Sequence, residues 1–261
     1  MNLLLDNKQI FIWILYFFIY AFIGWLLEVV YHVVKQGKFV NRGMLAGVIC
    51  PIYGFGSVVL AYILFPVKDN ILILFFGSAF ICTFLEYIAG LDKCFHKRWW
   101  DYSDNKFNLG GYVCLEFLLY WGAGGLILIR DVHSSIVNVV SLIPFKLLIG
   151  LDIVFVIIFI VDFISTVQAI LKFNKKLKLL SEMREDLYKI SDKVGAEVAD
   201  RTLNVMDKAE LLSKFTARER RIFRAFPSMR EERYIEAFSE LRERFEEWQS
   251  KQKNRHKLGE K

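Results

Sequence analysis

Five acidic residues lie inside long apolar stretches of the chain, and they are the strongest candidates in the sequence for a chemical role. These residues are Glu28, Glu86, Glu116, Asp152 and Asp162. A charged side chain in hydrocarbon costs about 2–3 kcal/mol or more unless it has a partner, water or a function. Each carboxylate is therefore expected to face the interior of a helix bundle, as part of a binding site, an ion pathway or a packing contact.

Glu28, Glu86 and Glu116 are expected at one depth in the membrane. Each lies about five to seven residues from the cytoplasmic end of its helix, which is roughly 8 to 10 Å at a rise of about 1.5 Å per residue. The common level predicts a shared polar pocket that opens toward the cytoplasm. The alternative is that these carboxylates only pair with neighbouring donors and hold the bundle together.

The loops at this membrane face supply counter-charges for the pocket. Arg42 and Arg98 lie in these loops, and His32 follows Glu28 by four residues, on the same helical face. Three acids against two arginines leave a negative surplus, so the pocket is expected to hold a proton, engage His32 or Lys93, or admit a cation. The candidate pocket residues are Glu28, His32, Arg42, Glu86, Arg98, Trp100, Asp101 and Glu116.

Motifs for catalysis, metal binding or nucleotide binding are absent from the sequence. No serine or cysteine motif of known mechanics accompanies the carboxylates, and no His or Cys spacing is diagnostic of a metal site. The phosphate-binding pattern GxxxxGK[ST] does not occur either. We therefore expect no catalytic residue, metal, cofactor or nucleic-acid partner, and any ATPase would be a separate chain.

The elements that carry these residues are predicted membrane helices. The chain is 55% hydrophobic with a mean hydropathy of +0.35, and five apolar stretches match the roughly 17 to 25 residues of a membrane span. These stretches are residues 10–34, 48–65, 71–91, 109–129 and 147–171. The sequence predicts an all-α polytopic bundle over residues 1–171, with an interfacial helix within 133–146.

The orientation of the bundle follows from the basic residues in its loops. The four loops carry three, one, four and two Lys or Arg residues in order, and basic loops stay on the cytoplasmic side. The alternation places the N-terminus outside and the C-terminus in the cytoplasm. Asp162, near the middle of the last stretch, is expected to face the bundle, either as a hydrogen-bond acceptor or in transport.

Residues 172–261 form a charged tail with the signals of soluble helices. All of the net charge of +6 lies in this tail. Its first basic residues, placed to meet anionic lipid headgroups, are Lys172, Lys175, Lys176 and Lys178. An amphipathic or coiled-coil helix is expected from Leu177 to Val198.

Two further helix starts are predicted in the tail from capping-box spacing, at Thr216 to Glu219 and at Ser228 to Glu231. One face of the second helix carries an apolar stripe. The stripe comprises Tyr234, Phe238, Leu241, Phe245 and Trp248. It is expected to pack on a neighbouring helix or to dock a partner.

Several motifs between residues 10 and 130 resemble one bacterial family. The motifs are Gly24-Trp25 with Glu28, Asn41-Arg42-Gly43, Cys50-Pro-Ile-Tyr-Gly54, Glu86-Tyr87, Trp99-Trp-Asp-Tyr-Ser103, and Asn108 with Gly111, Cys114 and Glu116. They are similar to the family labelled "putative ABC-transporter permease, type IV". The resemblance implies a multi-pass protein of the bacterial plasma membrane that works with a separate ATPase.

The function expected from these observations is that of a membrane-spanning subunit of a transport system, with a polar pocket on the cytoplasmic side. The main alternative is a membrane-anchored scaffold or regulator whose helical tail recruits a cytoplasmic partner. A third interpretation is a membrane-embedded enzyme that acts on lipid headgroups. The bilayer is an expected partner in every case. The sequence does not specify the substrate, the direction of transport or the oligomeric state.

Overall fold

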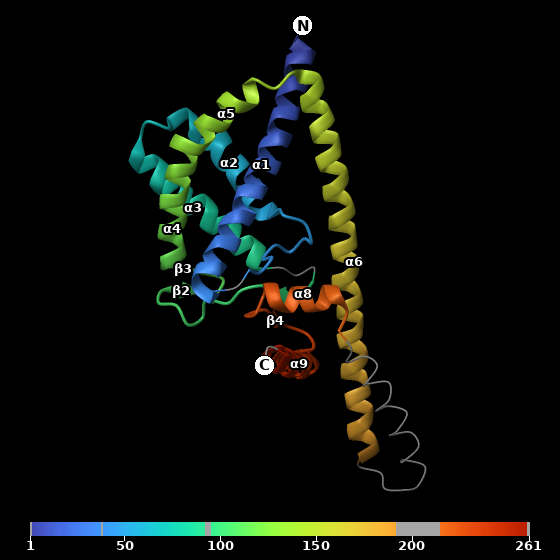
Figure 1. The fold of residues 1–261 in the computed structure, drawn as a ribbon. Helices are drawn as coiled ribbons and strands as arrows, with labels where there is room; N and C mark the ends of the chain where they lie inside the picture. The colour runs from blue at the N-terminus through green and yellow to red at the C-terminus, as the bar shows by residue number, and fades with distance from the viewer. Residues whose placement is uncertain (1, 38, 92–94, 192–214, 260–261) are drawn as a thin grey trace. The chain divides into compact units, whose positions relative to one another are not determined.

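The computed structural model describes residues 2–37, 39–91, 95–191 and 215–259, and the described chain is mostly helical (Figure 1). It divides into two compact units. The first comprises Met1–Leu91 and Trp100–Thr166, and the second comprises Asp92–Trp99 and Val167–Lys261. The segment directly after α3, Asp92–Trp99, thus groups with the tail, and the division within α6 falls five residues before the expected boundary at residue 171.

The first unit is a helix bundle with membrane-spanning segments. Its elements are α1 (Asn2–Gln36), α2 (Pro51–Leu64), the 3₁₀ turn η1 (Phe65–Val67), α3 (Ile71–Gly90), α4 (Leu115–Ile127), the π-helical turn η2 (Leu128–His133), α5 (Ser134–Ser141) and α6 (Phe145–Ser191). Four segments are long and apolar enough to cross a membrane, namely Lys8–Lys35, Ile71–Gly90, Leu115–Ser141 and Phe145–Glu185. A shorter apolar helix, Pro51–Val67, accompanies them. The predicted all-α polytopic bundle is confirmed.

Two expected helix boundaries were wrong. A turn occupies the start of one predicted helix, and the other predicted helix is not separate from the one before it. The fourth span was expected from residue 109, but a hairpin of β2 (Asn108–Leu109) and β3 (Val113–Cys114) delays α4 to Leu115. Gly110 and Gly111 have positive φ and form the turn. The expected separate interfacial helix within 133–146 instead continues from α4 through η2 into α5, without a break between Leu115 and Ser141.

Small residues let the helices of the first unit approach closely. A Cβ added to Gly24 of α1 would lie 2.2 Å from Tyr53 of α2, and one added to Gly125 of α4 would lie 2.2 Å from Ser78 of α3. Such contacts are common where membrane helices pack without a hydrophobic driving force. Consequently, α1 packs closely against α2, and α3 packs closely against α4.

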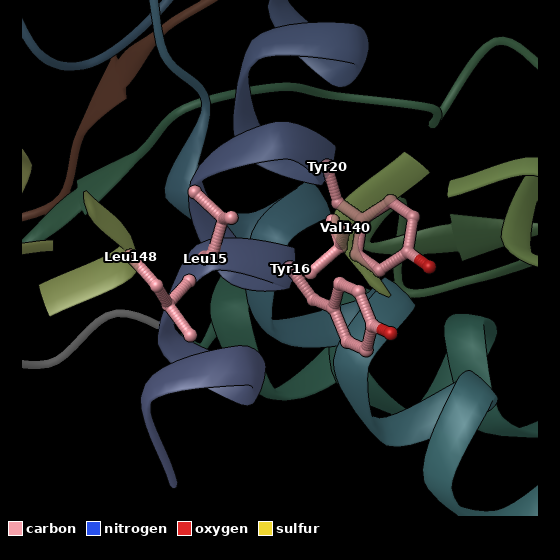
Figure 2. Close-up of a cluster of buried hydrophobic side chains, with 5 residues drawn as sticks. All are labelled: Leu15, Tyr16, Tyr20, Val140 and Leu148. Carbon is pink, nitrogen blue, oxygen red and sulfur yellow. The ribbon is translucent and has the colours of Figure 1, made fainter. Parts of the chain in front are cut away.

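A buried apolar cluster joins α1 to the later helices of the same unit (Figure 2). Leu15, Tyr16 and Tyr20 of α1 meet Val140 of α5 and Leu148 of α6. The hydroxyl of Tyr20 is hydrogen-bonded to Nδ1 of the buried His133 in η2. The π-helical turn η2 therefore places the imidazole ring of His133 inside the bundle, where the Tyr20 hydroxyl is its hydrogen-bond partner.

The second unit combines the end of α6 with two tail helices and a two-stranded pairing. Its elements are β1 (Lys97–Arg98), α8 (Ala217–Ala225), β4 (Arg230–Glu231) and α9 (Ile235–Gly259). β1 pairs antiparallel with β4. Thr216 and Glu219 form the predicted capping box at the start of α8, with both reciprocal hydrogen bonds present.

The prediction of a second capping box was wrong. Residues 230 and 231 form β4 instead of a first helical turn, and α9 begins only at Ile235. The backbone of this segment pairs with Lys97 and Arg98, which lie far away in the sequence. The prediction that the stripe packs on a neighbouring helix is confirmed, because Phe238 and Phe245 stack on Phe223 of α8.

The predicted helix from Leu177 onward is part of α6, which is one continuous helix of 47 residues. Val198 and its neighbours lie outside the described residues, so the coiled-coil hypothesis stays a prediction there.

Candidate functional site

A cavity of about 140 Å³ lies inside the first unit, between α1, α2, α3 and α4. It is partly open, and its wall is mostly apolar. Glycines on three of the helices contribute to the wall and leave room for it. The polar and aromatic side chains on the wall are Tyr20, Tyr53, Ser57, Glu86 and Trp121.

Glu86 is the acidic side chain on the cavity wall, and it is 6% exposed. Its oxygen Oε1 accepts a hydrogen bond of 3.0 Å from the hydroxyl of Tyr102, and Oε2 accepts one of 2.9 Å from Nε1 of Trp121. Both donors are neutral. Among the described residues, no lysine or arginine pairs with this carboxylate.

Tyr102 approaches Glu86 from the segment between α3 and α4, outside the membrane spans. Burial, and then the neighbouring Glu86 carboxylate, raise the pKa of the Tyr102 hydroxyl above its ordinary value. The hydroxyl therefore keeps its proton and remains a donor to Glu86 at neutral pH.

Glu28 is hydrogen-bonded to Tyr53 and has two further charged or polar neighbours. Its Oε2 is 3.7 Å from Nε of Arg42 and 3.9 Å from Nδ1 of His32. The hydroxyl of Tyr53 donates a bond of 2.7 Å to Oε1. The ring of Tyr53 also contacts the ring of Trp121 at 5.7 Å between centroids, so hydrogen-bonded aromatic rings connect Glu28 to Glu86.

Glu116 does not line this cavity. It lies in the first turn of α4, is exposed, and accepts bonds of 3.1 Å from Asn105 and from Tyr120. The structure therefore brings together Glu28, His32, Arg42 and Glu86 of the expected pocket and directs Glu116 to the surface.

The residues expected from the loop after α3 have separate roles. Arg98 belongs to β1 of the second unit, where it pairs in register with Arg230. Trp100 donates a bond of 2.9 Å to the backbone oxygen of Tyr112. Asp101 caps the following turn by accepting bonds from the backbone nitrogen and the hydroxyl of Ser103.

The two aspartates of α6 differ from each other. Asp162 accepts bonds from the backbone nitrogens of Ala46 at 3.1 Å and Gly47 at 2.7 Å, so it holds the loop before α2. Asp152 is 2% exposed, and neither of its oxygens has a hydrogen-bond partner among the described residues.

The four lysines after the last span also differ. Lys172, Lys175 and Lys178 are exposed, and Lys178 lies 3.6 Å from Glu182. Lys176 is buried and pairs with Glu219 of α8 at 3.2 Å, so this lysine stabilises the tail. Three of the four are therefore exposed, and the expectation that they meet lipid headgroups stays a prediction.

Four aromatic residues of the site were missed in the sequence: Tyr20, Tyr53, Tyr102 and Trp121. Tyr53 and Tyr102 do lie in the motifs Cys50-Pro-Ile-Tyr-Gly54 and Trp99-Trp-Asp-Tyr-Ser103. The signal that could have found them is the need of a buried carboxylate for donors. Among the described residues, no group of three or more His, Cys, Asp or Glu side chains is placed to hold a metal ion.

One comparison with known protein families covers the residues that form this site. A family model described as "Putative ABC-transporter type IV" matches residues 15–167, which contain the whole cavity. No curated protein and no solved structure is significantly similar to the chain.

Proposed function

The chain belongs to the family described as "Putative ABC-transporter type IV", and on that premise we propose that it is the membrane-spanning subunit of a transport system whose substrate enters the cavity beside Glu86. The observation that carries the proposal is a buried carboxylate on the wall of a partly open cavity between four helices. Ionisable residues kept inside a membrane bundle mark substrate and ion pathways.

The energy source in this proposal is a separate ATPase, because the sequence contains no phosphate-binding loop. The chain resides in the bacterial plasma membrane, with its N-terminus outside and its tail in the cytoplasm. The exposed Lys172 and Lys175, directly after the apolar part of α6, support this orientation.

The experiment is purification of the tagged chain from native membranes in a mild detergent. The expected result is an ATP-hydrolysing chain in the eluate, whereas a multi-pass protein of unrelated sequence with the same tag brings none. An eluate without ATP hydrolysis above that control would overturn the proposal of an ATP-driven transporter.

A scaffold or regulator is the second candidate function, and the compact second unit favours it. This unit has its own buried aromatic core and two buried ion pairs, as expected of a module that presents a surface to a cytoplasmic partner. A partner that hydrolyses no ATP, and whose co-purification is lost when residues 215–261 are deleted, would favour this function over transport.

A further inference from the structure

We propose that the cavity beside Glu86 binds a small organic cation of the alkylammonium class. The proposal rests on the proposed function, because it names the substrate class of that same cavity. Three properties of the cavity support it: the charge on its wall, the side chains around that charge, and the volume.

Among the described residues, no cationic side chain pairs with the carboxylate of Glu86. Both of its oxygens accept hydrogen bonds from neutral groups, Tyr102 and Trp121, and acceptance at both oxygens suits the ionised carboxylate. Burial among apolar side chains opposes the same charge. A cation within the cavity removes this conflict, whereas an anion makes it worse.

The neighbouring Glu28, which does not line the cavity, makes a useful contrast. Arg42 lies 3.7 Å from its carboxylate, and Tyr53 donates to it at 2.7 Å. Glu28 thus has a cationic partner among the described residues, whereas Glu86 has none there, and a bound cation would supply one. The binding position is therefore assigned to the Glu86 side of the cavity.

The side chains around Glu86 suit a cation with an apolar surface rather than a metal ion. Tyr20, Tyr53 and Trp121 line the cavity, and aromatic rings attract alkylammonium ions through the ring quadrupole. A bare metal ion would need several oxygen ligands, but among the described residues Glu86 is the single carboxylate on this wall. Aromatic rings with one carboxylate favour an organic cation.

The cavity volume sets the size of this cation. Since one water occupies about 30 Å³ in the liquid, a cavity of about 140 Å³ holds roughly four or five groups of that size. Tetramethylammonium, with five heavy atoms, matches this number.

Equilibrium dialysis of the purified full-length chain against radiolabelled tetramethylammonium tests the proposal. We expect saturable binding of one cation per chain, weakened about tenfold or more in Glu86→Gln, because the charge is lost while the shape is kept. Glu116→Gln is the matched control and should bind like the unchanged chain, since Glu116 does not line the cavity.

A second measurement does not depend on the folding of any variant. Tert-butanol has the same number of heavy atoms as tetramethylammonium but no charge, and it should not displace the bound cation from the unchanged chain. Equal displacement by tert-butanol, equal binding by Glu86→Gln, or no saturable binding at all would each overturn the proposal.

The binding result separates this proposal from the proposed function. Saturable cation binding without any co-purifying ATP hydrolysis would keep the cation site and reject the ATP-driven transporter. ATP hydrolysis in the eluate without cation binding would keep the transporter and reject the cation as its substrate.

Discussion

In the second unit, the buried acids Glu219 and Glu231 each face a lysine, whereas in the first unit the buried Glu86 faces only neutral donors among the described residues. Glu231 is paired with Lys97, both almost fully buried, and Nζ of Lys97 also lies 4.8 Å from the ring centre of Phe173. Glu86 instead borders an open volume. The two units thus bury negative charge in different surroundings.

This difference separates an acid that is paired inside the protein from one that borders a cavity. In a buried ion pair, each charge is compensated by its partner and is not available to a ligand. The loss of one partner leaves an uncompensated buried charge. A buried acid that has only neutral donors and borders a cavity can still bind a cation. The comparison predicts opposite responses of the two kinds of acid when the charge at each site is changed.

The largest effect is expected for Lys97→Met, which would leave Glu231 buried without its cation. We expect the free energy of opening α9 to fall by about 3–5 kcal/mol, measured by hydrogen exchange of its amides in the full-length protein. Lys178→Met is the control, because Lys178 pairs with Glu182 on the surface.

Rescue by a second substitution sharpens the same test. Lys97→Met combined with Glu231→Leu removes both charges, and apolar replacements of buried pairs are often neutral. Most of the lost protection of α9 should therefore return. A double variant as weak as the single one would mean that packing or the β1–β4 pairing, rather than charge, holds the second unit together.

A middle-sized effect is expected for Gly24→Ala in the first unit. The new Cβ would lie 2.2 Å from the Cβ and Cγ of Tyr53, so the ring that connects Glu28 to the cavity has to move. Overpacking of this kind costs about 1–3 kcal/mol, which thermal unfolding in detergent would detect.

Gly124→Ala is the control for that change. Gly124 also lines the cavity, but a Cβ there meets no atom within 4 Å, so the variant should be as stable as the unchanged protein or slightly more stable. Equal stability of both variants would show that α1 and α2 can separate without cost.

The smallest effect on stability is expected for Glu86→Gln. A glutamine can accept from Trp121 and donate to the Tyr102 hydroxyl, which is able to accept, and it no longer buries a charge. The free energy of unfolding should change by less than about 1 kcal/mol. A loss as large as that of Lys97→Met would show that the Glu86 charge is structural and would abolish the contrast between the units.

Hydropathy was enough to predict the helical bundle, because a helix that spans a membrane must be long and apolar. The helix starts that failed are those set by backbone pairing. Arg230 and Glu231 pair with residues more than a hundred positions away, so a capping-box pattern at Ser228 competes with a contact that the local sequence does not contain.

The site was predictable only in part. Glu116 was expected about seven residues inside its helix, but α4 begins only at Leu115. The number of residues from a helix end gives the level of a carboxylate, but not the side of the helix on which it lies. Glu116 is exposed at the start of α4, while Glu86 lies inside the bundle. Tyr53 and Trp121 complete the site through contacts between different helices, which spacing within one helix does not encode.

The continuity of α6 has a mechanical consequence. Its 47 residues form a rod roughly 70 Å long, and Asp162 fixes it by two hydrogen bonds to the loop before α2. The arm from Asp162 to Ser191 is roughly 44 Å long. Because α6 is continuous from Phe145 to Ser191, a displacement of the helix at Asp162 would pass along it without being absorbed by a loop.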